Sequence, residues 1–261
     1  GRIGRRDFIK RATALGLLAA VPSALLTEES RAAEPKRGGK FRQALQGGSV
    51  SDTLFGVLGG GGGHQRNVQY QLLNNVTEVT ADGDVIGELA ESWEASDDAT
   101  QWVFKLRQGV EFHNGKTLEA EDVIHSINVH RGEDSRSTGK GLVADVVDVK
   151  ADGKDTVIFT LTSGNADFPF VLADYHFSIA PAGSTDEDWE RGIGTGPFTL
   201  VDWNPGVRAA TKRNPNYFKE GKPYFDEVET LNVVDVVART NALQTNAVDV
   251  MDEPDIKTLD R

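Results

Sequence analysis

Apolar residues recur at two different spacings in different segments of this chain of 261 residues. In the segment 101–107, Trp102, Phe104 and Leu106 occupy every second position, which is the period of a half-buried strand. From about Glu119 onward, apolar residues instead recur at the spacing of an amphipathic helix. Both periods in one chain predict a mixed α/β fold.

Other segments follow the same two patterns. We expect further strands at 38–45, 155–162, 198–203, 208–214 and 228–234, a helix at 67–76, and a helix that begins at 238 and runs into a strand ending at 250. The turn Asn204-Pro205-Gly206 separates two of these strands and predicts a hairpin. The sequence contains no internal repeat.

The first 32 residues predict an export signal. Arg5 and Arg6 precede an apolar run, Ala12–Leu26, which is shorter than the roughly twenty residues that a membrane span needs. Ser30-Arg31-Ala32 has small residues at both ends of a cleavage box, so we expect a cut after Ala32. The paired arginines resemble a twin-arginine signal, which implies the twin-arginine export machinery as a partner and export of a folded protein. An amphipathic helix that caps a domain is the alternative.

Charge and composition narrow the function classes. The formal net charge is −12, and removal of the basic leader makes the remaining chain more acidic still. Such a protein is a poor candidate for binding nucleic acid or an anionic membrane. The sequence has no cysteine, which excludes disulfides and lipid attachment through cysteine. We therefore expect a soluble periplasmic monomer.

No catalytic or metal-binding motif is present. Gly115-Lys116-Thr117 resembles the end of a phosphate-binding loop, but Val110 stands where that motif requires glycine. The five histidines form no metal-binding pair at helical spacing, and the sequence has no nucleophile elbow of the GxSxG type. We therefore expect neither enzymatic activity nor a cofactor nor a bound metal.

Three ordered segments carry a family resemblance. They are 89–131 (LAESWEASDDATQWVFKLRQGVEFHNGKTLEAEDVIHSINVHR), 194–228 (GTGPFTLVDWNPGVRAATKRNPNYFKEGKPYFDEV) and 243–254 (LQTNAVDVMDEP). Together they resemble family 5 extracellular solute-binding proteins, the periplasmic oligopeptide-, dipeptide- and nickel-binding components of ABC importers. The chain departs from the family at Asn246-Ala247, where the family has a leucine–glycine–aspartate pattern, and at Leu54-Phe55-Gly56, where it often has Leu-Asp-Pro.

The resemblance implies a periplasmic-binding-protein-like architecture with two lobes. Residues 33–74 and 181–261 then form the first lobe, a mixed sheet with helices, and residues 75–180 form a subdomain inserted into it. By the same resemblance, the second lobe lies beyond Arg261 and is absent from this chain.

Two loops of the first lobe are expected to face the ligand. The resemblance assigns to the cleft the loop after the first strand and the loop after the Asp249 strand, with a third loop near the subdomain helix. Glycine lets a ligand approach the backbone closely, and acidic side chains can accept hydrogen bonds from a peptide. The expected ligand-binding residues are Gly60, Gly61, Gly62, Gly63, His64, Gln65, Ser137, Thr138, Met251, Asp252 and Glu253. A surface loop and a helix N-terminus with ordinary acidic residues remain the alternative.

The function implied by the resemblance is capture of a solute. We expect a binding protein that takes up peptides or similar small solutes and delivers them to the membrane subunits of an ABC permease. Metal-chelate or opine-like cargo is a variant of this function. A secreted enzyme or a structural envelope protein of the same fold is the alternative.

Overall fold

The computed structural model describes residues 36–55, 58, 62–255 and 257. The expected leader 1–32 lies outside the described residues, as do Gly60 and Gly61 of the expected site. The chain divides into two compact units, 1–36 and 37–261, and the described helices and strands all belong to the second. No helix in the described part is both long and apolar enough to cross a membrane.

A five-stranded sheet combines strands from distant parts of the chain. Its order is β11-β1-β10-β9-β8, built from β1 (Lys40–Leu45), β8 (Phe198–Asn204), β9 (Arg208–Arg213), β10 (Glu227–Asn232) and β11 (Val250–Met251). β1 runs parallel to both β10 and β11, whereas β9 is antiparallel to β10 and to β8. The strands expected in these segments are confirmed, as is the hairpin between β8 and β9 around Asn204-Pro205-Gly206.

Helix α2 (Gly63–Leu72) packs against β8 and β10 of this sheet. The sequence pattern placed this helix at 67–76, so its predicted start was four residues late. The helix ends because Leu73 is extended, and the carbonyl of Leu72 accepts a hydrogen bond from the amide of Gly196 at 2.9 Å. Val76 lies beyond the helix yet is fully buried, which explains its apolar character without a helical position.

Helix α6 (Val236–Gln244) leads into β11, as the sequence pattern predicted. Asp235 caps its start by accepting a hydrogen bond from the amide of Ala238 at 2.7 Å. Asn246 follows its end with a φ of 57°, in the left-handed region where asparagine is tolerated better than most residues. Asn246 therefore takes a backbone conformation that glycine adopts most readily.

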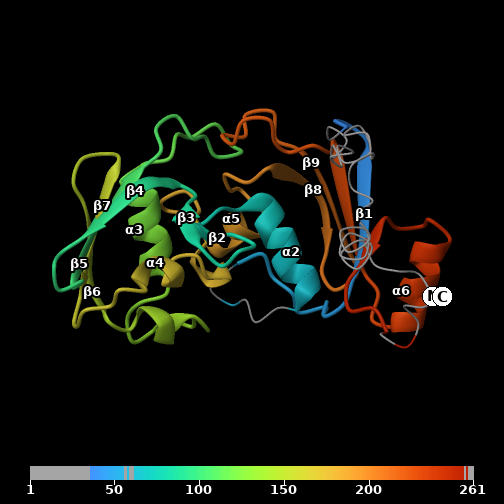
Figure 1. Cartoon of the computed structure of the whole chain (residues 1–261), viewed down its shortest axis with the longest axis horizontal. Coiled ribbons are helices and arrows are strands. Elements are labelled where there is room, and N and C mark those ends of the chain that lie inside the picture. Colours follow the sequence, from blue (N-terminus) through green and yellow to red (C-terminus); the bar gives the residue numbers. More distant parts are fainter. Residues whose placement is uncertain (1–35, 56–57, 59–61, 256, 258–261) are drawn as a thin grey trace, which may run out of the picture. The chain divides into compact units, whose positions relative to one another are not determined.

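The middle of the chain forms a four-stranded antiparallel sheet in the order β4-β5-β7-β6. Helix α3 (Ala120–Asn128) packs on β6 and β7 (Figure 1). The remaining elements of this region are β2 (Thr77–Val79), β3 (Val85–Gly87), β4 (Ala90–Ala95), β5 (Gln101–Leu106), β6 (Val146–Ala151), β7 (Thr156–Leu161), α4 (Phe168–Val171), α5 (Asp186–Glu190) and two 3₁₀ turns at Lys140–Val143 and Tyr175–Phe177.

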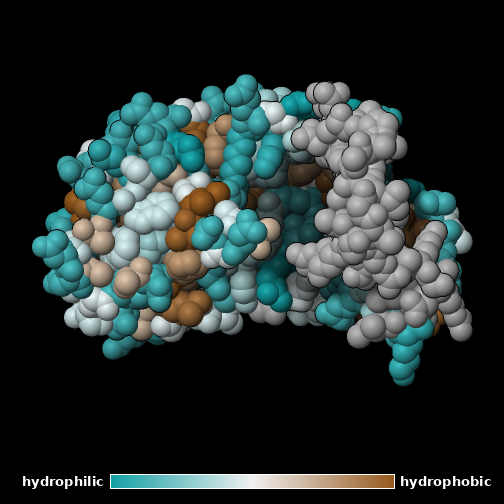
Figure 2. All heavy atoms as spheres, viewed as in Figure 1, coloured by the Kyte–Doolittle hydropathy of each residue, from teal (hydrophilic) through white to brown (hydrophobic). Residues whose placement is uncertain are grey.

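Aromatic side chains fill the core of this second sheet. Phe104 meets Phe159 edge-on with ring centroids 5.6 Å apart, and Phe168 lies 5.2 Å from Phe159. Trp102 and Leu106 are buried with them, which confirms the inward positions expected for β5. A separate cluster around α2 contains residues such as Val68, Leu72 and Trp189. The face in Figure 2 is mainly hydrophilic, in line with the charged composition.

Candidate functional site

The carboxyl ends of three parallel strands meet at one edge of the five-stranded sheet. β1 ends at Leu45, β10 at Asn232 and β11 at Met251, and each is followed by an irregular segment. Ligands of open α/β sheets bind outside the carboxyl ends of the strands. We call this region the carboxyl edge, defined by Gln46–Gly48, Gly62–Gln65, Asn232–Val234 and Met251–Glu253.

A close backbone crossing sets the position of α2 at the carboxyl edge. A Cβ atom added to Gly62 would lie 2.2 Å from the carbonyl oxygen of Gly47, so only glycine fits there. The amide of His64 donates to the carbonyl of Gln46 at 3.0 Å. These contacts fix the first turn of α2 against the segment that follows β1.

Asp252 joins the two loops that the sequence assigned to the site. Its Oδ2 accepts a hydrogen bond from the amide of Gln46 at 3.1 Å. The same oxygen would lie 3.4 Å from a Cβ on Gly63, in the first turn of α2. A carboxylate is favoured at a helix N-terminus, where unpaired amides create positive potential. Asp252 therefore stabilises the carboxyl edge itself while its side chain remains one-quarter exposed.

Glu253 has an unusual backbone next to Asp252. Its φ is 41°, a left-handed value that costs free energy for a residue other than glycine. The exposed side chain accepts a hydrogen bond from Nε2 of Gln46 at 2.7 Å. Strained residues of this kind gather at functional sites. Met251 precedes them in β11 and pairs with Ala44.

Arg239 of α6 is buried behind the loop that contains Asp252 and Glu253 and donates hydrogen bonds to its backbone. The residue is only 3% exposed, and its Nη1 donates to the carbonyls of Val233 and Val234 at 2.7 and 2.8 Å. Its Nε and Nη2 donate to the carbonyls of Asp252 and Glu253, each at 3.3 Å. A buried guanidinium thus ties the segment after β10 to the segment after β11.

His64 and Gln65 point into the protein. His64 is fully buried and stacks on Trp203 with ring centroids 5.7 Å apart, and burial lowers the pKa of its imidazole. Its Nδ1 lies 3.9 Å from Oδ2 of Asp52. Gln65 is also buried, and its amide donates to the carbonyl of Thr53. The side chains of His64 and Gln65 therefore face the core, and only their backbone lies toward the surface of the loop.

Ser137 and Thr138 belong to a different network. Ser137 Oγ lies 2.6 Å from Nδ1 of His130, and Thr138 Oγ1 lies 3.0 Å from Nε2 of His176. The other ring nitrogen of His176 lies 2.5 Å from Oδ1 of Asp174. The structure therefore brings Gly62, Gly63 and Met251–Glu253 together around Gln46, and holds Ser137 and Thr138 around two histidines.

Sequence reasoning missed the two residues that organise this site. Gln46 and Arg239 contact both Asp252 and Glu253, yet neither belongs to a recognisable motif. For Arg239, the available signal in the sequence was its position in a short helix that precedes the acidic residues Asp252 and Glu253. Among the described residues, no group of three or more histidine, aspartate or glutamate side chains could hold a metal ion.

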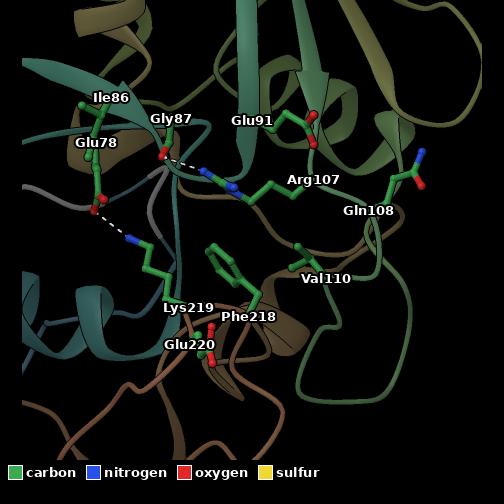
Figure 3. A pocket seen from close by; sticks show the side chains of 10 residues that line it. All are labelled: Glu78, Ile86, Gly87, Glu91, Arg107, Gln108, Val110, Phe218, Lys219 and Glu220. Atoms are coloured by element: carbon green, nitrogen blue, oxygen red, sulfur yellow. Dashed lines mark hydrogen bonds and ion pairs between the residues drawn. The ribbon is translucent and has the colours of Figure 1, made fainter.

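A hollow of about 770 Å³ lies beside the β2–β3 ribbon (Figure 3). Lys219 Nζ lies 2.7 Å from Glu78 and 3.0 Å from Glu88, and Arg107 donates to the carbonyl of Glu88 at 2.7 Å. Burial raises the pKa of the Glu88 carboxyl. Figure 3 shows the ring of Phe218 directed into the hollow. The hollow lies away from the carboxyl ends of the parallel strands, where ligands of open α/β sheets bind, so it is a weaker candidate than the carboxyl edge.

Residues 84–261 match the protein family described as bacterial extracellular solute-binding proteins, family 5 Middle. The chain belongs to this family. The expected family resemblance is thereby confirmed, and with it the mixed α/β, periplasmic-binding-protein-like fold.

Individual family 5 proteins show how much of the fold is present. The chain is 26% identical over 250 residues to the oligopeptide-binding protein AppA of Bacillus subtilis, covering 90% of this chain and 46% of that protein. It is 32% identical over 196 residues to the nickel-binding periplasmic protein of Escherichia coli, covering 72% and 37%. The solved structure of AgaA from A. tumefaciens R10 in complex with agropinic acid is 29% identical, with a TM-score of 0.75 and coverage of 82% and 43%. The chain thus spans less than half the length of these relatives.

Proposed function

We propose that this chain is the first-lobe part of a substrate-binding component of an ABC importer. In this proposal, residues 33–74 and 181–261 form the lobe, residues 75–180 form the inserted subdomain, and a second lobe completes the protein. The protein captures a peptide or similar small solute without catalysis and delivers it to the membrane subunits of a permease. Family membership and the carboxyl edge support this proposal.

The carboxyl edge carries the proposal because its polar groups converge from segments far apart in the chain. Gln46, Asp252 and Glu253 form one hydrogen-bonded surface, held rigidly by Arg239 from below. Binding groups are positioned best when loops stand on a rigid sheet. The acidic side chains suit a ligand that presents amide or ammonium donors, as a peptide does.

Cargo chemistry follows the same logic. The named relatives bind an oligopeptide, nickel or agropinic acid, so one fold accommodates cargo of very different chemistry. For this chain we favour a peptide, because two carboxylates at the carboxyl edge match a donor-rich ligand. Closure of two lobes around the cargo would then signal occupancy to the permease.

We also propose delivery to the periplasm through the twin-arginine machinery, as a monomer without a lipid anchor. The paired Arg5 and Arg6 before an uncharged apolar run support this route.

Mass spectrometry of solutes that co-purify with the two-lobed protein tests the function. We expect peptides in the wild-type sample and at least a tenfold weaker affinity for the identified peptide in Glu253→Gln, whose exposed side chain contacts Gln46, with little change in melting temperature. Glu91→Gln, an exposed substitution on β4, serves as the control. Unchanged peptide affinity in the carboxyl-edge variant would contradict the proposed site. An absence of any co-purified solute would contradict the proposed function.

A further inference from the structure

A pocket of about 470 Å³ lies on the α2 side of the five-stranded sheet. It is formed where β1 and β10 meet the C-terminal half of α2 and the segment 217–225. We call it the aromatic pocket, and its lining residues include Phe41, Gln43, Tyr70, Tyr217, Lys222, Tyr224 and Phe225. It involves Phe41 and Gln43 within β1, whereas the carboxyl edge begins after Leu45.

Aromatic rings form the walls of this pocket. Phe41 and Phe225 stack with centroids 4.8 Å apart and an interplanar angle of 14°. Tyr70 from α2 is 52% exposed, and Tyr224 and Phe225 are 39% and 38% exposed. Large aromatic surfaces gathered around a concavity favour a flat apolar ligand, because rings stack on rings and apolar area leaves water.

The floor of the pocket carries a hydrogen-bond acceptor with no partner. Gln43 is 6% exposed, and its Nε2 donates to Asn67 and, at 2.9 Å, to Thr230. Within the described residues, no group donates to its Oε1. The side chain of neighbouring Gln71 differs, because its Oε1 accepts a hydrogen bond from the Thr211 hydroxyl at 2.7 Å. The Oε1 of Gln43 is not among the fully buried atoms that lack a partner, so water reaches it, and a ligand that displaced this water without donating a hydrogen bond would leave it unpaired.

The exposed side chain of Lys222 adds a positive charge to the lining of the same pocket. Lys222 is exposed, and its ammonium makes no ion pair with any described residue. Lys219, which also lines the pocket, is engaged by Glu78 and Glu88. The pocket thus presents an acceptor at its floor, rings along its walls and one available positive charge at its opening.

We propose that the aromatic pocket binds a small aromatic carboxylate whose ring carries a hydroxyl or N–H group. The ring donor bonds to Oε1 of Gln43, the ring stacks between Tyr70 and the Phe41–Phe225 pair, and the carboxylate faces Lys222. This site is independent of cargo binding at the carboxyl edge.

The probe is 4-hydroxyphenylacetate, titrated into the two-lobed protein by calorimetry and by saturation-transfer NMR. Phenylacetate, which lacks the hydroxyl donor, should bind about fivefold more weakly because it leaves Gln43 unpaired. Lys222→Gln should weaken 4-hydroxyphenylacetate by a similar factor but leave 4-hydroxybenzyl alcohol, which has no carboxylate, unchanged. Lys150→Gln, an exposed lysine on β6, is the matched control.

Two further variants keep the test decisive. Gln43→Leu should remove the preference for the hydroxylated probe, and Tyr70→Ala, at a half-exposed position, should weaken both probes even if the Gln43 variant fails to fold. Glu253→Gln should leave the probe affinity unchanged, which separates this pocket from the carboxyl edge. Absence of binding, equal affinity for the two probes, or loss of binding in Glu253→Gln would overturn the proposal.

Discussion

Nε of Arg239 lies 3.3 Å from Oδ1 of Asp252, and the guanidinium that makes this contact is almost completely buried. The same guanidinium donates to four backbone carbonyls, two after β10 and two after β11. A single side chain thus holds together the segments that form the proposed ligand site.

Replacement of Arg239 by lysine should destabilise the protein. The ammonium is compact and cannot reach four carbonyls, so several buried acceptors lose their partners. We expect a loss of about 2–4 kcal/mol in the free energy of unfolding, measured by urea denaturation. Arg191→Lys on the exposed surface after α5 is the control, with a change within about 0.5 kcal/mol. Equal stability of the two variants would contradict the proposed role of Arg239.

Gly62→Ala and Gly63→Ala form a matched pair at the start of α2. A Cβ at Gly62 would lie 2.2 Å from the Gly47 carbonyl, whereas at Gly63 the nearest atom is 3.4 Å away, an ordinary contact. We expect Gly62→Ala to lower the free energy of unfolding by about 2 kcal/mol and Gly63→Ala to leave it unchanged or raise it slightly. Thermal denaturation of both variants checks this. Similar melting temperatures would show that the crossing does not restrict residue 62.

Asp122 connects the start of α3 to the segment around Ala182. Its fully buried carboxylate accepts hydrogen bonds from the Lys116 ammonium at 2.6 Å, the Glu119 amide at 2.8 Å and the Ala182 amide at 2.6 Å. Asp122→Ala should lower the free energy of unfolding by about 3 kcal/mol, because it leaves three partly buried donors without their acceptor. Glu121→Ala, exposed on the same turn, should change the stability by less than about 0.5 kcal/mol. A mild effect at Asp122, close to that at Glu121, would refute this assignment.

His130 should make the fold sensitive to acid. Burial, with a further contribution from nearby His176, lowers the pKa of His130 from 6.5 to about 4. Because the folded pKa is depressed, this contribution to stability is fully present above pH 6.5 and is lost as the pH falls toward 4. The shift corresponds to about 3 kcal/mol.

His130→Phe removes the titration and keeps an aromatic ring against Phe177. The free energy of unfolding of this variant should fall less between pH 7 and pH 4 than that of the wild type, by urea denaturation at each pH. His125→Phe on α3 is the control. An identical pH dependence of wild type and His130→Phe would rule out His130 as a source of acid sensitivity.

Arg5→Lys combined with Arg6→Lys tests the export route. The double variant should accumulate as uncleaved precursor in the cytoplasm, detected by fractionation and immunoblotting, because twin-arginine export reads the arginine pair. Arg2→Lys with Arg11→Lys is the matched control and should be processed normally. Normal processing of the first variant, with a block by an inhibitor of general secretion, would instead assign the protein to that pathway.

The sequence pattern was most informative where one face of an element is buried. In β5 and β7 the apolar residues at every second position identified the strands and their inward faces, since one face meets an aromatic core. The pattern misplaced α2 because apolar Val76 continues the helical spacing past the actual end at Leu72. That end is set by Gly196, which lies more than a hundred residues later and leaves no local signal.

The candidate site was accessible from the sequence in part. Family resemblance directed attention to Gly62, Gly63 and Met251–Glu253, and the structure places these segments together. It gave no hint that the His64 and Gln65 side chains point inward, since burial depends on contacts with Trp203 and Thr53. Gln46 and Arg239 escaped notice for the same reason, because their importance lies in tertiary hydrogen bonds, from Gln46 to the side chains of Asp252 and Glu253 and from Arg239 to backbone carbonyls.

The position of β1 in its sheet has a consequence for the order of folding. The four-stranded sheet is complete once Leu161 has been synthesised, but β1 obtains its first partner only with β10, which ends at Asn232. At roughly 5–20 residues per second, the first strand waits several seconds longer on the ribosome than the middle of the chain. Pairing across such a sequence separation is intrinsically slow, because the loop must close before the contacts form. During this interval β1 is an unpaired strand with exposed hydrogen-bonding groups, which is the kind of segment that pairs wrongly with other chains.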